Sequence, residues 1–191
     1  MNPITMVLVA ALTFGICFLC DKLFIKAFRS KRQHRTGLSV RVSKRYASFG
    51  AVLIVLGIAA IFTGMGTGGA LLWGGVVVLV IGIGLIVYYN SFAVFYDDDS
   101  FLLNTFGKKG QTYAFRDIRF QQLYLIQGGS IVVELHLTDG NALSIHSSME
   151  GAYPFLDHAF AAWCRQTGKK VEDCNFHDLA NSLWFPNKEE A

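Results

Sequence analysis

Long apolar stretches dominate the first ninety residues, and this pattern predicts helices that cross a membrane. A helix rises 1.5 Å per residue, so roughly 20 apolar residues span the ~30 Å hydrocarbon core of a bilayer. Three stretches meet this requirement, at about residues 4–25, 47–66 and 70–90, and their apolar centres carry no charged side chain. We therefore expect residues 1–90 to form a transmembrane region with three helical spans.

Two other interpretations of these stretches fit the sequence less well. A chain of 191 residues could hardly enclose three wholly apolar helices in a soluble core. A cleaved signal peptide begins with basic residues, but the first basic residue, Lys22, follows the first stretch, and no A-x-A motif closes that stretch. We expect the first span to be retained. The glycines within the spans should let the helices pack closely; they are Gly57, Gly74, Gly75, Gly82 and Gly84.

Charge predicts the orientation of the spans. The loop at residues 21–46 holds nine Lys and Arg against one acidic residue. Short basic loops stay in the cytoplasm, so we expect the N-terminus outside and everything after residue 90 in the cytoplasm. Basic side chains near a bilayer attract anionic headgroups by ~1 kcal/mol each. The expected headgroup contacts are Lys31, Arg32, Arg35, Arg41, Lys44 and Arg45.

The remaining residues, 91–191, are acidic, with eight Lys and Arg against thirteen Asp and Glu. The net charge of +3 for the whole chain conceals this division. Because topology already accounts for the basic loop, we expect no nucleic-acid partner. The basic loop could also dock on the acidic part of the chain.

Short alternating runs separated by turn residues follow residue 91 and predict six antiparallel strands. The runs are at residues 92–96, 101–106, 111–115, 119–127, 131–137 and 142–147. One helix follows, in which Leu156, Phe160 and Trp163 recur with a helical period and form the face expected to pack on the sheet. Gly168 stands where a left-handed residue ends a helix. A tail at residues 168–191 should pack on the domain through a short helix near 176–184, or serve as a docking segment.

The last two strands permit a prediction of register. A three-residue loop at 139–141 keeps the apolar faces of both strands aligned, whereas a two-residue Asp-Gly turn would oppose them. This loop places Glu134 opposite His146 and His136 opposite Ser144. Glu134, His136 and His146 would then share one exposed patch. The patch is either a metal or acid–base site or an ordinary solvated strand face.

The run of short strands with acidic and Gly-rich turns, "FRDI" before a long strand, a "DG" hairpin and a helix containing Trp163 resembles the bacterial pleckstrin-homology-like domain over about residues 91–167. The resemblance implies two near-orthogonal sheets in a β-barrel-like arrangement capped by the C-terminal helix, with Trp163 packed inside. The chain departs from the family in two ways. It shows six strands instead of seven, and Asp97–Asp99 replaces the basic residues of phosphoinositide-binding members. We expect no phosphoinositide binding through that loop.

Motifs of common enzyme classes are missing from the sequence. It has no G-x-S-x-G, no H-E-x-x-H and no phosphate-binding Gly-rich loop. We therefore expect no catalytic activity, cofactor or metal. The predicted function is a multi-pass cell-membrane protein that acts as a non-enzymatic binding or scaffold module, with a protein or a second copy as partner. Three alternatives stay open: an accessory subunit of a membrane transport or secretion complex, a membrane immunity or stress protein, and a metal-dependent enzyme that uses the Glu134, His136 and His146 patch.

Overall fold

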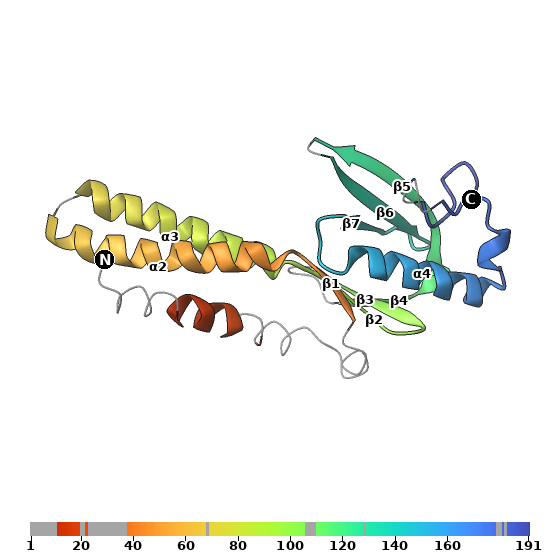
Figure 1. Ribbon diagram of the computed structural model, residues 1–191, viewed down its shortest axis with the longest axis horizontal. Helices are drawn as coiled ribbons and strands as arrows, with labels where there is room; N and C mark the ends of the chain where they lie inside the picture. Colours follow the sequence, from red (N-terminus) through yellow and green to blue (C-terminus); the bar gives the residue numbers. More distant parts are fainter. Residues whose placement is uncertain are drawn as a thin grey trace. The chain divides into compact units, whose positions relative to one another are not determined.

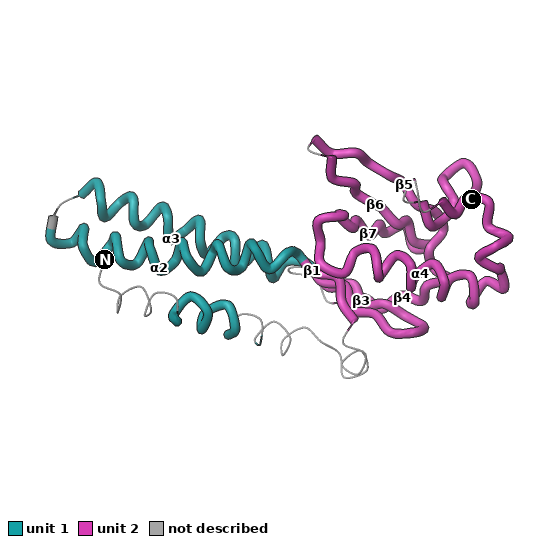
Figure 2. Tube along the Cα trace, in the orientation of Figure 1, with its two compact units in different colours: residues 1–29, 42–92 teal, residues 30–41, 93–191 magenta. Residues whose placement is uncertain are grey.

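The chain forms two compact units, shown in Figure 2: residues 1–29 with 42–92, and residues 30–41 with 93–191. We call them the helical unit and the sheet unit. The computed structural model describes residues 11–19, 22, 38–67, 69–105, 110–127, 129–178, 181 and 183–191.

Two long apolar helices, α2 (Lys44–Thr67) and α3 (Gly69–Tyr89), make up most of the helical unit (Figure 1). Both are long and apolar enough to cross a membrane. Large apolar side chains are exposed on both helices, and Trp73 is 68% exposed. An all-round apolar surface of this kind suits lipid better than water. Of the first expected span, residues 11–19 and 22 are helical, and the rest lies outside the described residues.

Glycines at seven-residue intervals bring α2 and α3 into backbone contact. They are Gly50, Gly57 and Gly64 on α2, and Gly75 and Gly82 on α3. A Cβ added at Gly57 would lie 2.8 Å from the backbone nitrogen of Leu79. Only glycine allows such an approach. The expectation of close packing is therefore right for Gly57, Gly75 and Gly82. Among the described residues it does not hold for Gly74 and Gly84, where an added Cβ would meet no described atom within 4 Å.

Seven strands form two antiparallel sheets in the described part of the chain. The first sheet has the order β1-β2-β3-β4 and the second β5-β6-β7. The strands are β1 (Ser39–Arg41), β2 (Phe92–Tyr96), β3 (Ser100–Thr105), β4 (Gln111–Ala114), β5 (Ile118–Ile126), β6 (Ser130–Leu137) and β7 (Ala142–His146). The 3-10 helix η1 (Phe115–Asp117) joins the two sheets along the chain. The sheets remain separate in their hydrogen bonding, so these strands do not close into a barrel.

The prediction of six strands missed β1, which lies in the segment expected to be a basic cytoplasmic loop. Val40 of β1 pairs with Val94 of β2 and is fully buried. On its other side, the N–H of Arg41 donates to the carbonyl of Glu150 at 3.1 Å, and the N–H of Glu150 donates back at 2.9 Å. Part of the basic loop is therefore a strand of the sheet unit.

Helix α4 (Ala152–Thr167) follows the second sheet and packs its apolar face into the core of the sheet unit. Leu156, Phe160 and Trp163 are buried there, as their periodicity predicts. The indole N–H of Trp163 donates to the carbonyl of Ile118 at 3.0 Å. Gly168 ends the helix with φ 73°, which confirms the predicted left-handed cap.

The C-terminal tail packs on the sheet unit, as expected. Trp184 and Phe185 are buried, and both of their backbone N–H groups donate to the Oε1 of Gln121, at 3.0 and 2.9 Å. The indole of Trp184 donates to Asp157 at 2.7 Å. The short helix expected near 176–184 includes residues outside the described ones. Within the described part, Asp178 forms an isolated antiparallel β-bridge with Leu183. A short 3-10 helix, η2, lies earlier, at Val171–Asp173.

Candidate functional site: the outer face of the second sheet

Polar and aromatic side chains gather on the face of β5 and β6 that points away from the core. A bulge between Ile118 and Phe120 sets which β5 residues face outward. Beyond the bulge, Phe120 pairs with His136, and Gln122 pairs with Glu134. We call Phe120, Gln122, Tyr124, Glu134 and His136 the outer-face cluster.

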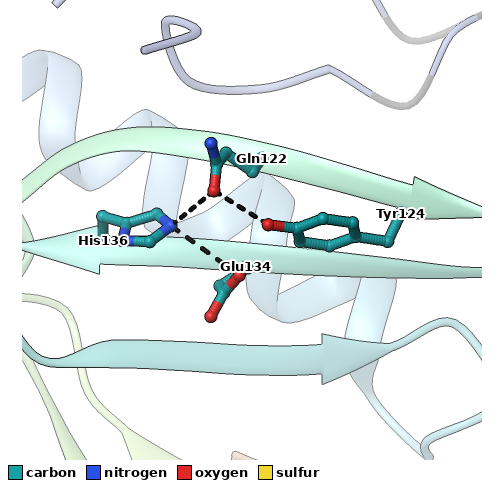
Figure 3. Close-up of polar contacts among 4 residues, drawn as sticks. All are labelled: Gln122, Tyr124, Glu134 and His136. Carbon is teal, nitrogen blue, oxygen red and sulfur yellow. Dashed lines mark hydrogen bonds and ion pairs between the residues drawn. The ribbon is translucent and has the colours of Figure 1, made fainter.

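Hydrogen bonds tie the cluster together, and Figure 3 shows four of its side chains pointing toward one another. The Oε1 of Gln122 lies 3.0 Å from Nε2 of His136 and accepts from the Tyr124 hydroxyl at 2.9 Å. Because an amide oxygen only accepts, Nε2 of His136 carries the proton in this arrangement. The carboxylate of Glu134 lies 3.7 Å from the same nitrogen. The Phe120 and His136 rings stack with centroids 4.4 Å apart.

These contacts link the side chains of the cluster, which is partly exposed. Loss of solvent around its hydroxyl raises the pKa of Tyr124, and the neighbouring Glu134 carboxylate raises it further. Tyr124 is therefore a neutral donor at physiological pH. The cluster offers donors, acceptors and two aromatic rings on one sheet face. Such a mixture is typical of protein-binding surfaces, where Tyr and other amphipathic side chains are enriched.

The register of β6 and β7 differs from the prediction by two residues. His146 lies opposite Val132, and Glu134 lies opposite Ser144. The connecting loop has three residues, as predicted, but they are 138–140. The Leu137 N–H donates to the Asn141 carbonyl at 2.9 Å, and Gly140 takes φ 84°. Alternation was predicted correctly, because Val133, Leu135, Leu143 and Ile145 are all buried.

The corrected register weakens the metal hypothesis for this face. Glu134 and His136 lie together, but His146 is displaced along β7 and does not lie opposite either of them. Within the described ranges, no three His, Cys, Asp or Glu side chains are placed to hold one metal ion. Sequence reasoning singled out Glu134 and His136 and missed Phe120, Gln122 and Tyr124. Their signal was the alternation Phe-x-Gln-x-Tyr within one strand.

A second polar group lies at the β6–β7 loop. The Asp139 carboxylate accepts from the backbone N–H of Asn141 at 2.9 Å and from the Tyr113 hydroxyl at 3.0 Å. These hydrogen bonds, the Asn141 N–H above all, lower the pKa of Asp139. Tyr113 belongs to β4, so the group ties the two sheets together. Burial, followed by the Asp139 side chain, raises the pKa of Tyr113.

The lowered pKa of Asp139 predicts an acid-sensitive contribution to stability. A carboxylate whose pKa is lower in the folded state stabilises the fold above its unfolded-state pKa of about 3.8, and loses this effect as the pH falls through the folded value. Asp139→Asn should therefore be less stable than the native chain near pH 6, and the difference should shrink as the pH falls below 3.8. Denaturant unfolding followed by tryptophan fluorescence measures the difference in stability at each pH. A difference independent of pH would contradict this.

The Asp97–Asp99 turn is built into the fold. Asp97 is buried, and its Oδ1 accepts from the Ser100 N–H at 2.7 Å, the Ser100 hydroxyl at 3.0 Å and the Asp99 N–H at 3.1 Å. From α4, Gln166 donates to the Asp99 carbonyl at 2.9 Å, and Arg165 donates to the Asp98 carbonyl at 3.3 Å. Asp98 and Asp99 remain exposed. That this loop does not bind phosphoinositides stays a prediction.

Asp97→Ala should destabilise the sheet unit by about 1–3 kcal/mol, because it leaves partly buried donors of the turn without their acceptor. Asp98→Ala is the matched control, since it removes an exposed carboxylate from the same turn. Thermal unfolding of both variants measures the difference. Equal melting temperatures would show that the Asp97 carboxylate does not hold the turn.

Half of the expected headgroup contacts can be placed. Lys44 and Arg45 are exposed in the first turn of α2, directly before its apolar stretch. Arg41 is partly buried in β1, and Lys31, Arg32 and Arg35 lie outside the described residues. Within the helical unit, Lys44 and Arg45 line a groove of about 520 Å³ whose apolar wall includes Phe14, Phe49 and Val52. A basic rim over an apolar wall suits the headgroup region of a bilayer.

We compared the chain with protein-family models, curated proteins and solved structures, and none of the three comparisons found a match.

Proposed function

We propose that the chain is a membrane-anchored, non-enzymatic binding module that presents the outer-face cluster to a protein partner. The observation that carries this proposal is how the helices join the sheet unit. Only Val42 and Ser43 separate β1 from α2, and only Asn90 and Ser91 separate α3 from β2. β1 and β2 also pair with each other. The helix pair is thus an insertion between two neighbouring strands.

Two short connections restrict the module more than one flexible linker would. Two residues reach about 7 Å when fully extended. If α2 and α3 cross the bilayer, the sheet unit stays beside it and cannot search the cytosol. This arrangement suits assembly of a complex at the membrane. The basic loop at residues 21–46 supports placing the sheet unit in the cytoplasm, with the first span carrying the N-terminus outside.

The order of elements supports a pleckstrin-homology-like identity for the sheet unit. The resemblance implies seven strands, two sheets and a capping C-terminal helix. A four-stranded sheet, a three-stranded sheet and then α4 agree with that order. β1 supplies the strand missing from the sequence-based count. Trp163 packs from α4 against the carbonyl of Ile118, at the start of the second sheet. The family offers a binding scaffold, so the partner must be argued from the surface.

Partner capture by the full chain in mild detergent tests the proposal. His136→Ala and Gln122→Ala should each reduce capture, because they disrupt the hydrogen-bonded centre of the cluster. Ser144→Ala is the matched control, as an exposed residue on the same face of the neighbouring strand. Capture that is unchanged in every variant, and that persists when the sheet unit is removed, would favour an accessory subunit that binds through its helices.

A further inference from the structure

The outer edge of β5 is paired with another segment of the chain only near the start of the strand. β5 is an edge strand of the second sheet. At Gln121 the tail pairs with it: the Gln121 N–H donates to the Pro186 carbonyl at 2.9 Å, and Gln121 forms a parallel bridge with Asn187. The chain then turns, with the Glu190 N–H donating to the Asn187 carbonyl. The rest of β5 continues past the tail into a hairpin with β6 (Figure 1).

The exposed part of this edge has backbone groups available for pairing. Along a strand, successive residues direct their N–H and C=O groups to opposite sides. Gln121 directs its N–H away from β6, toward the tail, so Leu123 and Leu125 direct theirs to the same outer edge. Among the residues that the structure describes, neither leucine has a hydrogen-bond partner on that side.

The side chains along this edge are uncharged and mostly apolar. Leu125 is 83% exposed, Tyr124 47% and Ile126 44%. No charged residue occurs between Arg119 and Glu134. Soluble edge strands are normally protected against pairing by charges, proline, bulges or short length. β5 has nine residues, and its one bulge lies at its start, before this segment.

We propose that β5 pairs with β5 of a second copy of the chain, antiparallel about a two-fold axis. Leu123 then lies opposite Leu125 of the second copy, and Tyr124 lies opposite its own counterpart. Both leucine pairs direct backbone groups toward each other, so each pair forms two hydrogen bonds. The leucines meet on one face, and no like charges oppose one another. The two three-stranded sheets become one six-stranded sheet.

Neighbouring registers fit less well. A shift by two residues toward the start of β5 sets Leu125 opposite Gln121, whose edge the tail already occupies. A shift toward the tip sets Leu123 opposite Gln127, which lies beyond the end of β5. In the proposed register, the outward backbone groups of Leu123 and Leu125 in one copy pair only with the same groups in the other copy.

This pairing goes beyond the proposed function and does not depend on it. The pairing uses backbone groups at the sheet edge, whereas the outer-face cluster presents side chains on the sheet face, and Tyr124 alone belongs to both. A monomeric chain whose partner capture still depends on His136 would overturn the pairing and leave the proposed function standing.

Disulfide crosslinking of the full chain in detergent or nanodiscs tests the pairing. Tyr124→Cys places two thiols across the axis, with Cβ atoms about 4.5–5.5 Å apart, close to the spacing of a disulfide. Mild oxidation should give a covalent dimer. Ser144→Cys is the matched control, because Ser144 is exposed but lies on β7, which forms the opposite edge of the three-stranded sheet. The native chain measures background from its own cysteines. No dimer above these controls overturns the proposal.

Leu125→Lys should raise the dimer dissociation constant roughly tenfold or more, since it places a charge opposite an apolar residue in both leucine pairs. Leu125 is so exposed that folding of the single chain should not change, and its thermal unfolding checks this. A dimer that survives Leu125→Lys would show that the helices hold it together.

An environment-sensitive dye on Tyr124→Cys that reports lipid in nanodiscs, without crosslinking, would assign the hairpin to the bilayer. Either result overturns the pairing.

Discussion

Trp163→Ala should lower the free energy of unfolding of the sheet unit by about 3–5 kcal/mol, as truncation of a buried aromatic residue does. Trp163 is 5% exposed and stacks on Phe160, with Phe176 and Phe185 edge-on to its ring. Its indole also satisfies the Ile118 carbonyl. The substitution therefore removes ring contacts and a buried hydrogen bond together. Because the tail contributes two of these rings, the tail should loosen as well.

Denaturant unfolding of the full chain, followed by the fluorescence of the remaining tryptophans Trp73 and Trp184, measures this effect. Trp163→Phe is the matched control, since it keeps a ring in the core and removes only the indole donor. Its cost should be nearer 1–3 kcal/mol, the penalty for an unsatisfied carbonyl. Equal stability of Trp163→Ala and the native chain would mean that α4 does not pack as described.

Gly57→Val should disrupt the packing of α2 on α3. An added Cβ meets the backbone of Leu79 at 2.8 Å and the carbonyl of Gly75 at 2.9 Å. Backbone atoms cannot rotate away, so the helices must separate along their length. Overpacking typically costs about 1–3 kcal/mol, and a backbone clash should exceed that range. Thermal unfolding in detergent measures the loss.

Gly84→Val controls for the change in helix propensity. Gly84 lies within α3, and no described residue has an atom within 4 Å of a Cβ added there. We expect its melting temperature to stay close to that of the native chain. If both variants lose stability equally, the loss comes from β-branching and not from the helix interface.

Short-range residue patterns predicted both long helices, the buried face of one strand and the end of α4. Apolar length predicted α2 and α3, alternation predicted the buried face of β6, and Gly168 predicted the end of α4. β1 was missed because three residues in a basic loop carry no usable alternation. Its place in the sheet depends on pairing with β2, about fifty residues later, and on the bridge to Glu150. Such pairings are tertiary, and no short window of sequence records them.

The candidate site was predicted only in part, for a similar reason. The β6–β7 register failed by two residues because the loop begins one residue earlier than expected. The φ of 84° at Gly140 shows the missing criterion: glycine fits the left-handed position that ends a three-residue loop. Gln122 and Tyr124 depend on the bulge near Phe120, which decides the outward face of β5. Because the bulge places Gln122 on the outward face, it also places Gln122 within hydrogen-bonding distance of His136.

Cysteine labelling of the full chain in its native membrane tests the central claim most directly, that α2 and α3 anchor a cytoplasmic sheet unit. Met65→Cys marks the exposed end of α2, and Ser144→Cys marks the sheet unit. A membrane-impermeant maleimide should label Met65→Cys in intact cells and Ser144→Cys only in inverted vesicles, with the native chain as background. Labelling of Ser144→Cys in intact cells would reverse the orientation, and labelling of both positions from one side would show that the helices do not span the membrane.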